Sequence, residues 1–122
     1  MTFMLDQRLE NDTIFVQDLP LCRVLLMNDS RYPWLILVPR REDMRDIHDL
    51  SPDDRAILME ETAQISEHMC KVTKAEKMNV ASLGNIVPQL HVHIIARQTS
   101  DETWPNPVWG QGTAIPLSLI HI

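Results

Sequence analysis

The stretch at residues 89–95, Gln-Leu-His-Val-His-Ile-Ile, constrains the fold of this chain more than any other. It is rich in β-prone apolar residues, and side chains two apart in a strand point to the same side of a sheet. The even-numbered positions are all apolar and form one row, which indicates a surface facing the core. Gln89, His91 and His93 begin the opposite row. The pattern therefore predicts a strand with one buried face and one line of polar side chains.

A long helix is the second clear prediction. Ser51 is a favourable N-cap, Pro52 suits the first helical position, and the acidic pair that follows complements the positive end of the helix dipole. Positions 58, 62, 65, 69 and 72 then form a mostly apolar stripe at spacings of three and four. Glu61 and its charged neighbours are expected on the outer side, and the helix is expected to end near Lys74.

The remaining elements give an α+β layout, with helices against one face of a mostly antiparallel sheet. A single domain is expected over residues 1–122, with a core at about 21–104 and a C-terminal tail at 105–122. The other expected elements are a short helix at 5–11, strands at 14–17, 21–27, 34–38, 78–82 and 89–97, a turn at 28–33, and a loop at 84–88.

Composition excludes several classes of protein. A hydrophobic fraction of 44% and a charged fraction of 23% are ordinary for a globular domain, and a net charge of −6 disfavours binding to a nucleic-acid backbone. No apolar run is long enough to cross a membrane, and no signal peptide is apparent, so a cytoplasmic location is expected. Cys22 and Cys70 match no paired spacing and are interpreted as reduced thiols.

The polar row has three interpretations. An imidazole can attack an electrophilic phosphorus while a second imidazole and Gln89 donate to the phosphoryl oxygens, helped by backbone N–H groups near Gly84 and Asn85. A His-x-His pair on a strand is also a common two-ligand metal unit, but no spacing nominates a third ligand from His48, His68 or His121. The third interpretation is a pair of satisfied surface histidines.

The stretch resembles the hallmark of the histidine triad (HIT) family of nucleotide-binding proteins, hydrolases and transferases, which is His-φ-His-φ-His-φ-φ with φ apolar. His91 and His93 match the second and third histidines, and Gln89 replaces the first, as in a QxHxH branch of the family. The likeness covers roughly residues 21–104. Its other parts are the segments 24–28 and 34–39, similar to a strand pair of the family, the segment 47–53, similar to the lead into its long helix, and the Trp-Pro pair at 104–105.

The resemblance implies a HIT-like fold, with about five mostly antiparallel strands, one long helix and one short helix. It implies a hydrolase or transferase acting at the α-phosphorus of a small nucleotide derivative, of the phosphoramidate or dinucleoside polyphosphate type. No metal or cofactor is intrinsic, although a divalent cation could accompany a polyphosphate substrate, and a homodimer is expected. By position, His91 matches the nucleophile of the family and His93 matches a residue that contacts the α-phosphate. Asn28 matches a residue that contacts the ribose, and Asn79 matches an amide that contacts the phosphate or the substrate. Gly84-Asn85 matches the family's Gly-Gln.

Three residues depart from the family pattern. Gln89 and Trp34 stand where many members have histidine, and Ile86 stands where many have a hydroxyl side chain. Because glutamine cannot carry a proton at neutral pH, we expect protonation of the leaving group to differ. A catalytically weak nucleotide-binding or sensing module is the alternative, followed by a His-x-His metal-binding protein. Trp104 and Trp109 are candidates for closing the pocket or a dimer seam, with packing of the tail as the plainer explanation.

Overall fold

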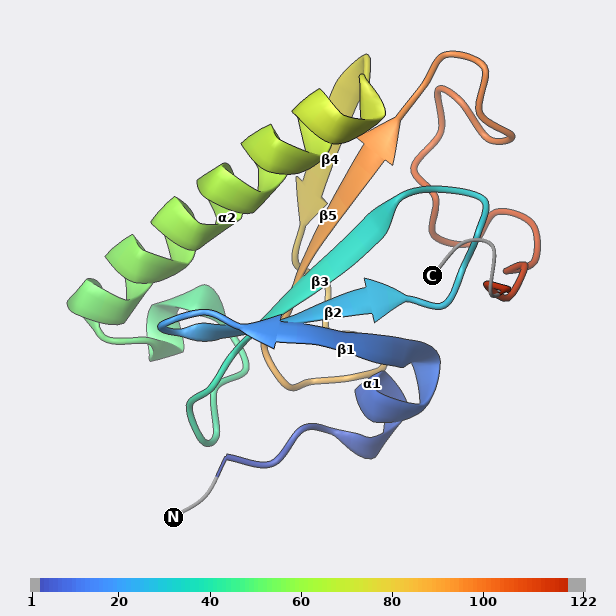
Figure 1. Ribbon diagram of the computed structural model, residues 1–122. Helices are drawn as coiled ribbons and strands as arrows, with labels where there is room; N and C mark the ends of the chain where they lie inside the picture. Colours follow the sequence, from blue (N-terminus) through green and yellow to red (C-terminus); the bar gives the residue numbers. More distant parts are fainter. Residues whose placement is uncertain (1–2, 119–122) are drawn as a thin grey trace.

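The structure, a computed structural model that describes residues 3–118, is built on one antiparallel sheet with a long helix across one face (Figure 1). The strand order is β1-β2-β3-β5-β4, and every neighbouring pair is antiparallel. The predicted α+β class, with five strands, one long helix and one short helix, is confirmed. In chain order the elements are α1 (Gln7–Asp12), β1 (Thr13–Asp18), β2 (Cys22–Met27), β3 (Trp34–Pro39), the 3-10 helix η1 (Ile47–Asp49), α2 (Pro52–Thr73), β4 (Lys77–Ala81) and β5 (Val92–Arg97).

Strand β5 lies inside the sheet, between β3 and β4, and its two faces meet different cores. Leu90, Val92 and Ile94 belong to the core cluster that also contains Leu58 and Met69 of α2. Ile95 belongs to a second cluster, together with Leu9 of α1 and residues of β2 and β3. The apolar row is therefore buried as predicted, but the opposite row is buried as well. The expectation of helices against one face is wrong, because α1 and α2 pack against opposite faces of the sheet.

The strand begins at Val92, not at residue 89 as the alternation predicted. Two of the three residues before it, Gln89 and Leu90, are bonded to other parts of the chain instead of to a neighbouring strand. Leu90 N donates to Met44 O at 2.9 Å, and the side chain of Gln89 is bonded to the N-terminal segment. Alternation of side chains thus continues past the point where strand pairing stops.

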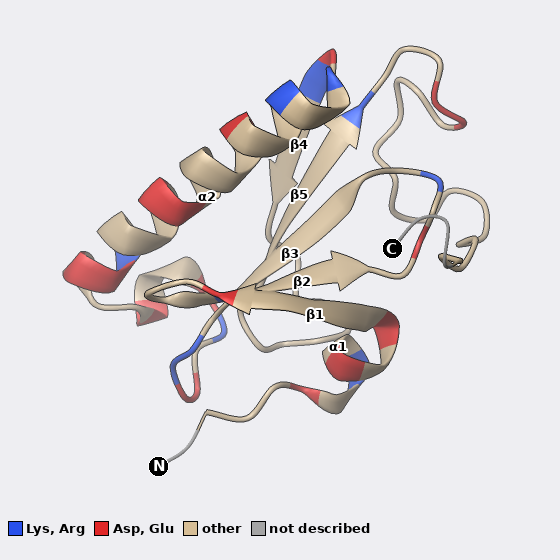
Figure 2. Cartoon of the chain, viewed as in Figure 1, with Lys and Arg blue, Asp and Glu red and all other residues tan. Residues whose placement is uncertain are grey.

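Helix α2 has the predicted boundaries. Ser51 Oγ accepts the backbone N–H of Asp54 at 3.1 Å, and the helix ends at Lys74, whose φ of 56° is left-handed. Figure 2 shows acidic residues near its start and basic residues near its end, as the helix dipole favours. Val72, expected on the apolar stripe, is exposed because it lies in the last turn of the helix.

Glu61 corrects the sequence interpretation of this helix, since it is buried with 6% of its surface exposed. Its carboxylate oxygens accept the backbone N–H groups of Leu21 and Cys22, at 2.9 and 2.8 Å. These donors stand at the start of β2, where a buried N–H without a partner would be costly. Helical periodicity placed Glu61 on the solvent side of the helix. The helix sequence alone does not show that the backbone N–H groups at the start of β2 need a carboxylate acceptor.

The segment after β5 is anchored by a buried arginine. Arg97 donates to both carboxylate oxygens of Asp101, at 2.7 and 3.0 Å, and to Asn79 Oδ1 at 3.0 Å. Its guanidinium also lies over the rings of Tyr32 and Trp104, 5.4 and 5.5 Å from their centroids. The chain is thereby directed back across the sheet, on the side away from α2 (Figure 1).

Within residues 3–118, no helix combines the length and the apolar character needed to cross a membrane. Cys22 and Cys70 are both free thiols, as expected. Burial, together with the nearby Glu61 carboxylate, raises the pKa of the Cys22 thiol, so this group stays protonated and unreactive at neutral pH.

Candidate active site

The two histidines of the motif lie side by side in a cleft on the face opposite α2. His91 directly precedes β5 and His93 is its second residue, and their exposed fractions are only 5% and 6%. The ring centroids are 4.9 Å apart and the planes are inclined by 70°. Both rings border a cleft of about 360 Å³. Because both histidines are buried, the interpretation as a pair of satisfied surface histidines is wrong about their exposure.

His91 is oriented by the backbone just before it. Its Nδ1 lies 2.7 Å from the carbonyl oxygen of Gln89. A carbonyl can only accept, so Nδ1 carries the proton of the neutral ring and Nε2 keeps its lone pair. A neutral imidazole held in this way presents Nε2 as a nucleophile or a metal ligand.

His93 has the opposite arrangement. The indole Nε1 of Trp34 lies 3.0 Å from His93 Nδ1, and an indole N–H can only donate. Nδ1 is therefore the bare nitrogen, and the proton of the neutral ring is on Nε2. Burial, with a smaller effect from His91, lowers the pKa of His93 to about 4, so the ring is neutral at physiological pH.

The walls of the cleft are mostly apolar. The edge of Trp109 packs against His93, with ring centroids 5.1 Å apart. This tail residue therefore closes one side of the cleft, which is one of the roles expected for it. The N-terminal helix forms another wall, which sequence reasoning missed because nothing in its pattern connects it to the histidines. The principal wall residues are Leu9, Asp12, Thr13, Met27, Ile36, Leu83, Val87 and Trp109.

Gly84 and Asn85 border the cleft, at the loop between β4 and the histidines. Gly84 has a φ of 88°, a left-handed conformation that a side chain would strain. Ile86 follows at the rim with 80% of its surface exposed, and its carbonyl accepts a hydrogen bond from Arg8 at 2.8 Å. The rim therefore presents an apolar side chain where many HIT proteins present a hydroxyl.

Three predicted site residues are not brought to the cleft lining. The side chain of Gln89 accepts from Asp6 N at 2.7 Å and donates to Met4 O at 2.9 Å, and it borders a separate hollow with Met44. Asn28 Oδ1 accepts from Leu117 N at 2.8 Å, in the C-terminal tail. Asn79 Oδ1 accepts from the buried Arg97 instead.

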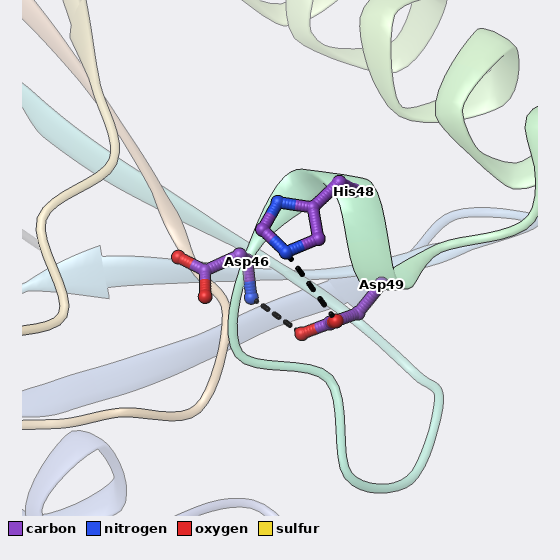
Figure 3. A group of neighbouring side chains, drawn as sticks. All are labelled: Asp46, His48 and Asp49. Atoms are coloured by element: carbon purple, nitrogen blue, oxygen red, sulfur yellow. Dashed lines mark hydrogen bonds and ion pairs between the residues drawn. The ribbon is translucent and has the colours of Figure 1, made fainter.

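The structure also addresses the metal interpretation. Among the described residues, no third His, Cys, Asp or Glu joins His91 and His93 in a compact set of potential ligands. His48 lies elsewhere, in an exposed group with Asp46 and Asp49 (Figure 3). Asp49 in that group accepts the N–H of Asp46 at 2.9 Å and so caps η1, which accounts for its position. His68 is exposed on α2, and His121 lies outside the described residues.

Comparison with known proteins agrees with this architecture, an α+β sheet with paired histidines on its open face. The HIT domain profile matches residues 8–100, and the chain therefore belongs to the HIT family. A histidine triad protein from Bradyrhizobium japonicum has 48% sequence identity and a TM-score of 0.97, with 98% of this chain and 90% of that chain covered. No curated protein matches the sequence at a significant level.

Two further solved structures are similarly close. A histidine triad protein from Sinorhizobium meliloti has 53% identity and a TM-score of 0.95, with 96% of this chain and 87% of that chain covered. One from Marinobacter aquaeolei has 44% identity and a TM-score of 0.97, with 99% and 88% covered. The fold is therefore shared with these proteins over nearly the whole chain.

Proposed function

We propose that the protein hydrolyses or transfers the nucleotidyl group of a small nucleotide derivative, through an intermediate in which the group is bonded to His91. The observation that carries this proposal is that two adjacent buried imidazoles have opposite hydrogen-bond partners, an acceptor at His91 and a donor at His93. One ring offers a lone pair on Nε2 and the other offers an N–H on Nε2. A nucleophile and a donor on a rigid element are what substitution at phosphorus requires.

In the first step, the lone pair of His91 Nε2 attacks the α-phosphorus and the bond to the leaving group breaks. The leaving group departs with the bonding electron pair and takes a proton from water, because the neutral His93 and the Gln89 amide are poor acids. The imidazole becomes cationic, and its Nδ1–H remains bonded to the Gln89 carbonyl. Water then attacks the same phosphorus, releases the nucleoside monophosphate and a proton, and restores neutral His91.

Neutral donors stabilise the phosphoryl oxygens in this scheme. Among the described residues that border the cleft there is no Lys or Arg. His93 Nε2–H and backbone N–H groups near Gly84 and Asn85 are therefore assigned this role. The apolar wall formed by Leu9, Ile36 and neighbouring side chains suits the flat face of a nucleobase. No metal or cofactor is part of the proposal, apart from a divalent cation that a polyphosphate substrate would bring.

The experiment is turnover and labelling with a panel of adenylated compounds. Because a phosphorus–imidazole bond is labile in acid, the reaction is stopped in alkaline denaturant and the intact protein mass is measured. We expect wild type to release the monophosphate and to gain a nucleotidyl mass. His91→Ala is expected to lose both while still binding nucleoside monophosphate, and His68→Ala, which alters an exposed histidine on α2, serves as the matched control.

Two outcomes oppose the proposal. If wild type binds the monophosphate but neither turns over the panel nor labels, the nucleotide-binding or sensing alternative is favoured, which the apolar Ile86 and the occupied amide of Gln89 already motivate. If His91→Ala labels as well as wild type, the nucleophile is another residue. Stoichiometric metal in the purified protein would instead favour the His-x-His metal-binding alternative.

The homodimer implied by the family resemblance is also a proposal, as is the cytoplasmic location expected from the sequence. Sedimentation equilibrium tests the first. A molecular mass of one chain at micromolar protein concentration would exclude a stable dimer.

A further inference from the structure

Trp34 makes a buried hydrogen bond whose direction can be read from chemistry alone. It lies on β3, opposite Ile95 and diagonal to His93, so both side chains are on the same face of the sheet. Its Nε1 lies 3.0 Å from His93 Nδ1, and both residues are buried. The bond is therefore largely shielded from water.

This bond selects one of the two neutral forms of His93. If the proton were on Nδ1, two N–H groups would face each other and the buried indole would lose its acceptor. The loss of a buried hydrogen bond disfavours that form roughly ten- to hundredfold. Because an indole N–H can only donate, Trp34 cannot form a hydrogen bond with the other neutral form of His93.

We infer that Trp34 is a positioning residue for the proposed reaction, whose indole N–H keeps the His93 proton on Nε2, in a ring whose centroid lies 4.9 Å from that of His91. This inference rests on the proposed function for its catalytic consequence, whereas the protonation of His93 can be tested without any substrate. A histidine at position 34, the residue that many HIT proteins have there, could donate, accept or titrate. Tryptophan restricts the site to donation, at every pH at which the protein folds.

A second tryptophan provides a matched control. Trp109 packs against the same imidazole, with centroids 5.1 Å apart, but its buried Nε1 has no hydrogen-bond partner among the described residues. Trp34→Phe therefore reduces the aromatic ring and removes a hydrogen bond, whereas Trp109→Phe reduces the aromatic ring without removing a hydrogen bond. Replacing Trp34 by its benzothiophene analogue, in which sulfur takes the place of the N–H, keeps the ring size and is used if Trp34→Phe does not fold.

The first measurement is NMR of the protein with ¹⁵N-labelled histidine, which reports which ring nitrogen of His93 carries the proton. We expect wild type and Trp109→Phe to show the proton on Nε2 only. Trp34→Phe and the analogue are expected to show a mixture of both forms. A wild-type proton on Nδ1, or a single unchanged form after loss of the indole N–H, overturns the inference.

The second measurement is kinetic, with a substrate from the panel that wild type turns over. We expect Trp34→Phe and the analogue to lower kcat in proportion to the share of His93 with its proton on Nδ1, about twofold for an equal mixture, with KM little changed, because the misplaced proton weakens stabilisation of the transition state. An unchanged kcat alongside a mixed protonation state overturns the positioning role. Absence of wild-type turnover overturns the proposed function instead, and is thereby distinguished from failure of this inference.

Discussion

Lowering the pH from 7 to 5 is expected to destabilise the protein through His93. Burial, with a smaller effect of His91 at 4.9 Å between ring centroids, lowers the pKa of His93 from 6.5 to about 4. Between these values the unfolded chain binds a proton at this position and the folded chain does not. The contribution to stability is therefore fully present above pH 6.5 and is lost as the pH falls toward 4.

The magnitude follows from the width of this pH window. Each pH unit inside it costs about 1.4 kcal/mol, and protonation of the unfolded chain is only partial near pH 6.5. The loss between pH 7 and pH 5 is therefore about 2 kcal/mol, a large share of the 5–15 kcal/mol that is typical of a domain. Asp101, whose pKa is lowered by its hydrogen bonds from Arg97, titrates below this range and does not contribute to the loss.

The assay is urea unfolding followed by far-ultraviolet circular dichroism at pH 7, 6 and 5, with wild type and His93→Gln at one protein concentration. Glutamine keeps an acceptor for the Trp34 N–H but does not titrate. Wild type is expected to lose about 2 kcal/mol more than the variant between pH 7 and pH 5. Equal losses in the two proteins would refute the argument that burial holds His93 neutral.

Two further substitutions test the polar groups that hold the fold. Glu61→Gln replaces one of two acceptors with a donor that faces the N–H groups of Leu21 and Cys22, so we expect a loss of about 2 kcal/mol in the same unfolding assay. Arg97→Met leaves the Asp101 carboxylate buried without its cation and is expected to cost about 3 kcal/mol, whereas Lys71→Met, on an exposed ion pair, is expected to leave the unfolding midpoint nearly unchanged. A similar small effect from Arg97→Met would contradict the buried-pair argument.

Most of the fold could be predicted because its determinants are local. The cap at Ser51, the stripe of α2 and the alternation around His93 each involve residues within a few positions of one another. The errors arise where a distant partner overrides the local pattern. Glu61 is drawn inward by backbone donors about 40 positions away in the chain, and Gln89 is bonded to Met4 and Asp6 at the other end of the chain.

The candidate site could likewise be predicted where its geometry is local, and could not where a distant residue determines it. The pairing of His91 and His93 follows from their spacing alone, since a strand places them on one face. Asn28 and Asn79 were assigned to the ligand by resemblance, but their amides are bonded to the tail and to Arg97, partners that no local pattern reveals. The α1 wall was missed for a related reason, because an amphipathic helix indicates that one face is buried without indicating against what.

The spacing of the two histidines does not predict which ring nitrogen of each carries the proton. They are chemically identical, adjacent and equally buried, yet one is bonded to an acceptor and the other to a donor. The carbonyl partner of His91 belongs to the motif itself and accompanies it wherever it folds. The indole partner of His93 comes from another strand, at position 34, and its replacement would alter the site while the motif stayed intact. In the proposed reaction, the chemistry of the paired-histidine motif therefore depends on a residue of the neighbouring strand, Trp34, which lies diagonal to the last histidine.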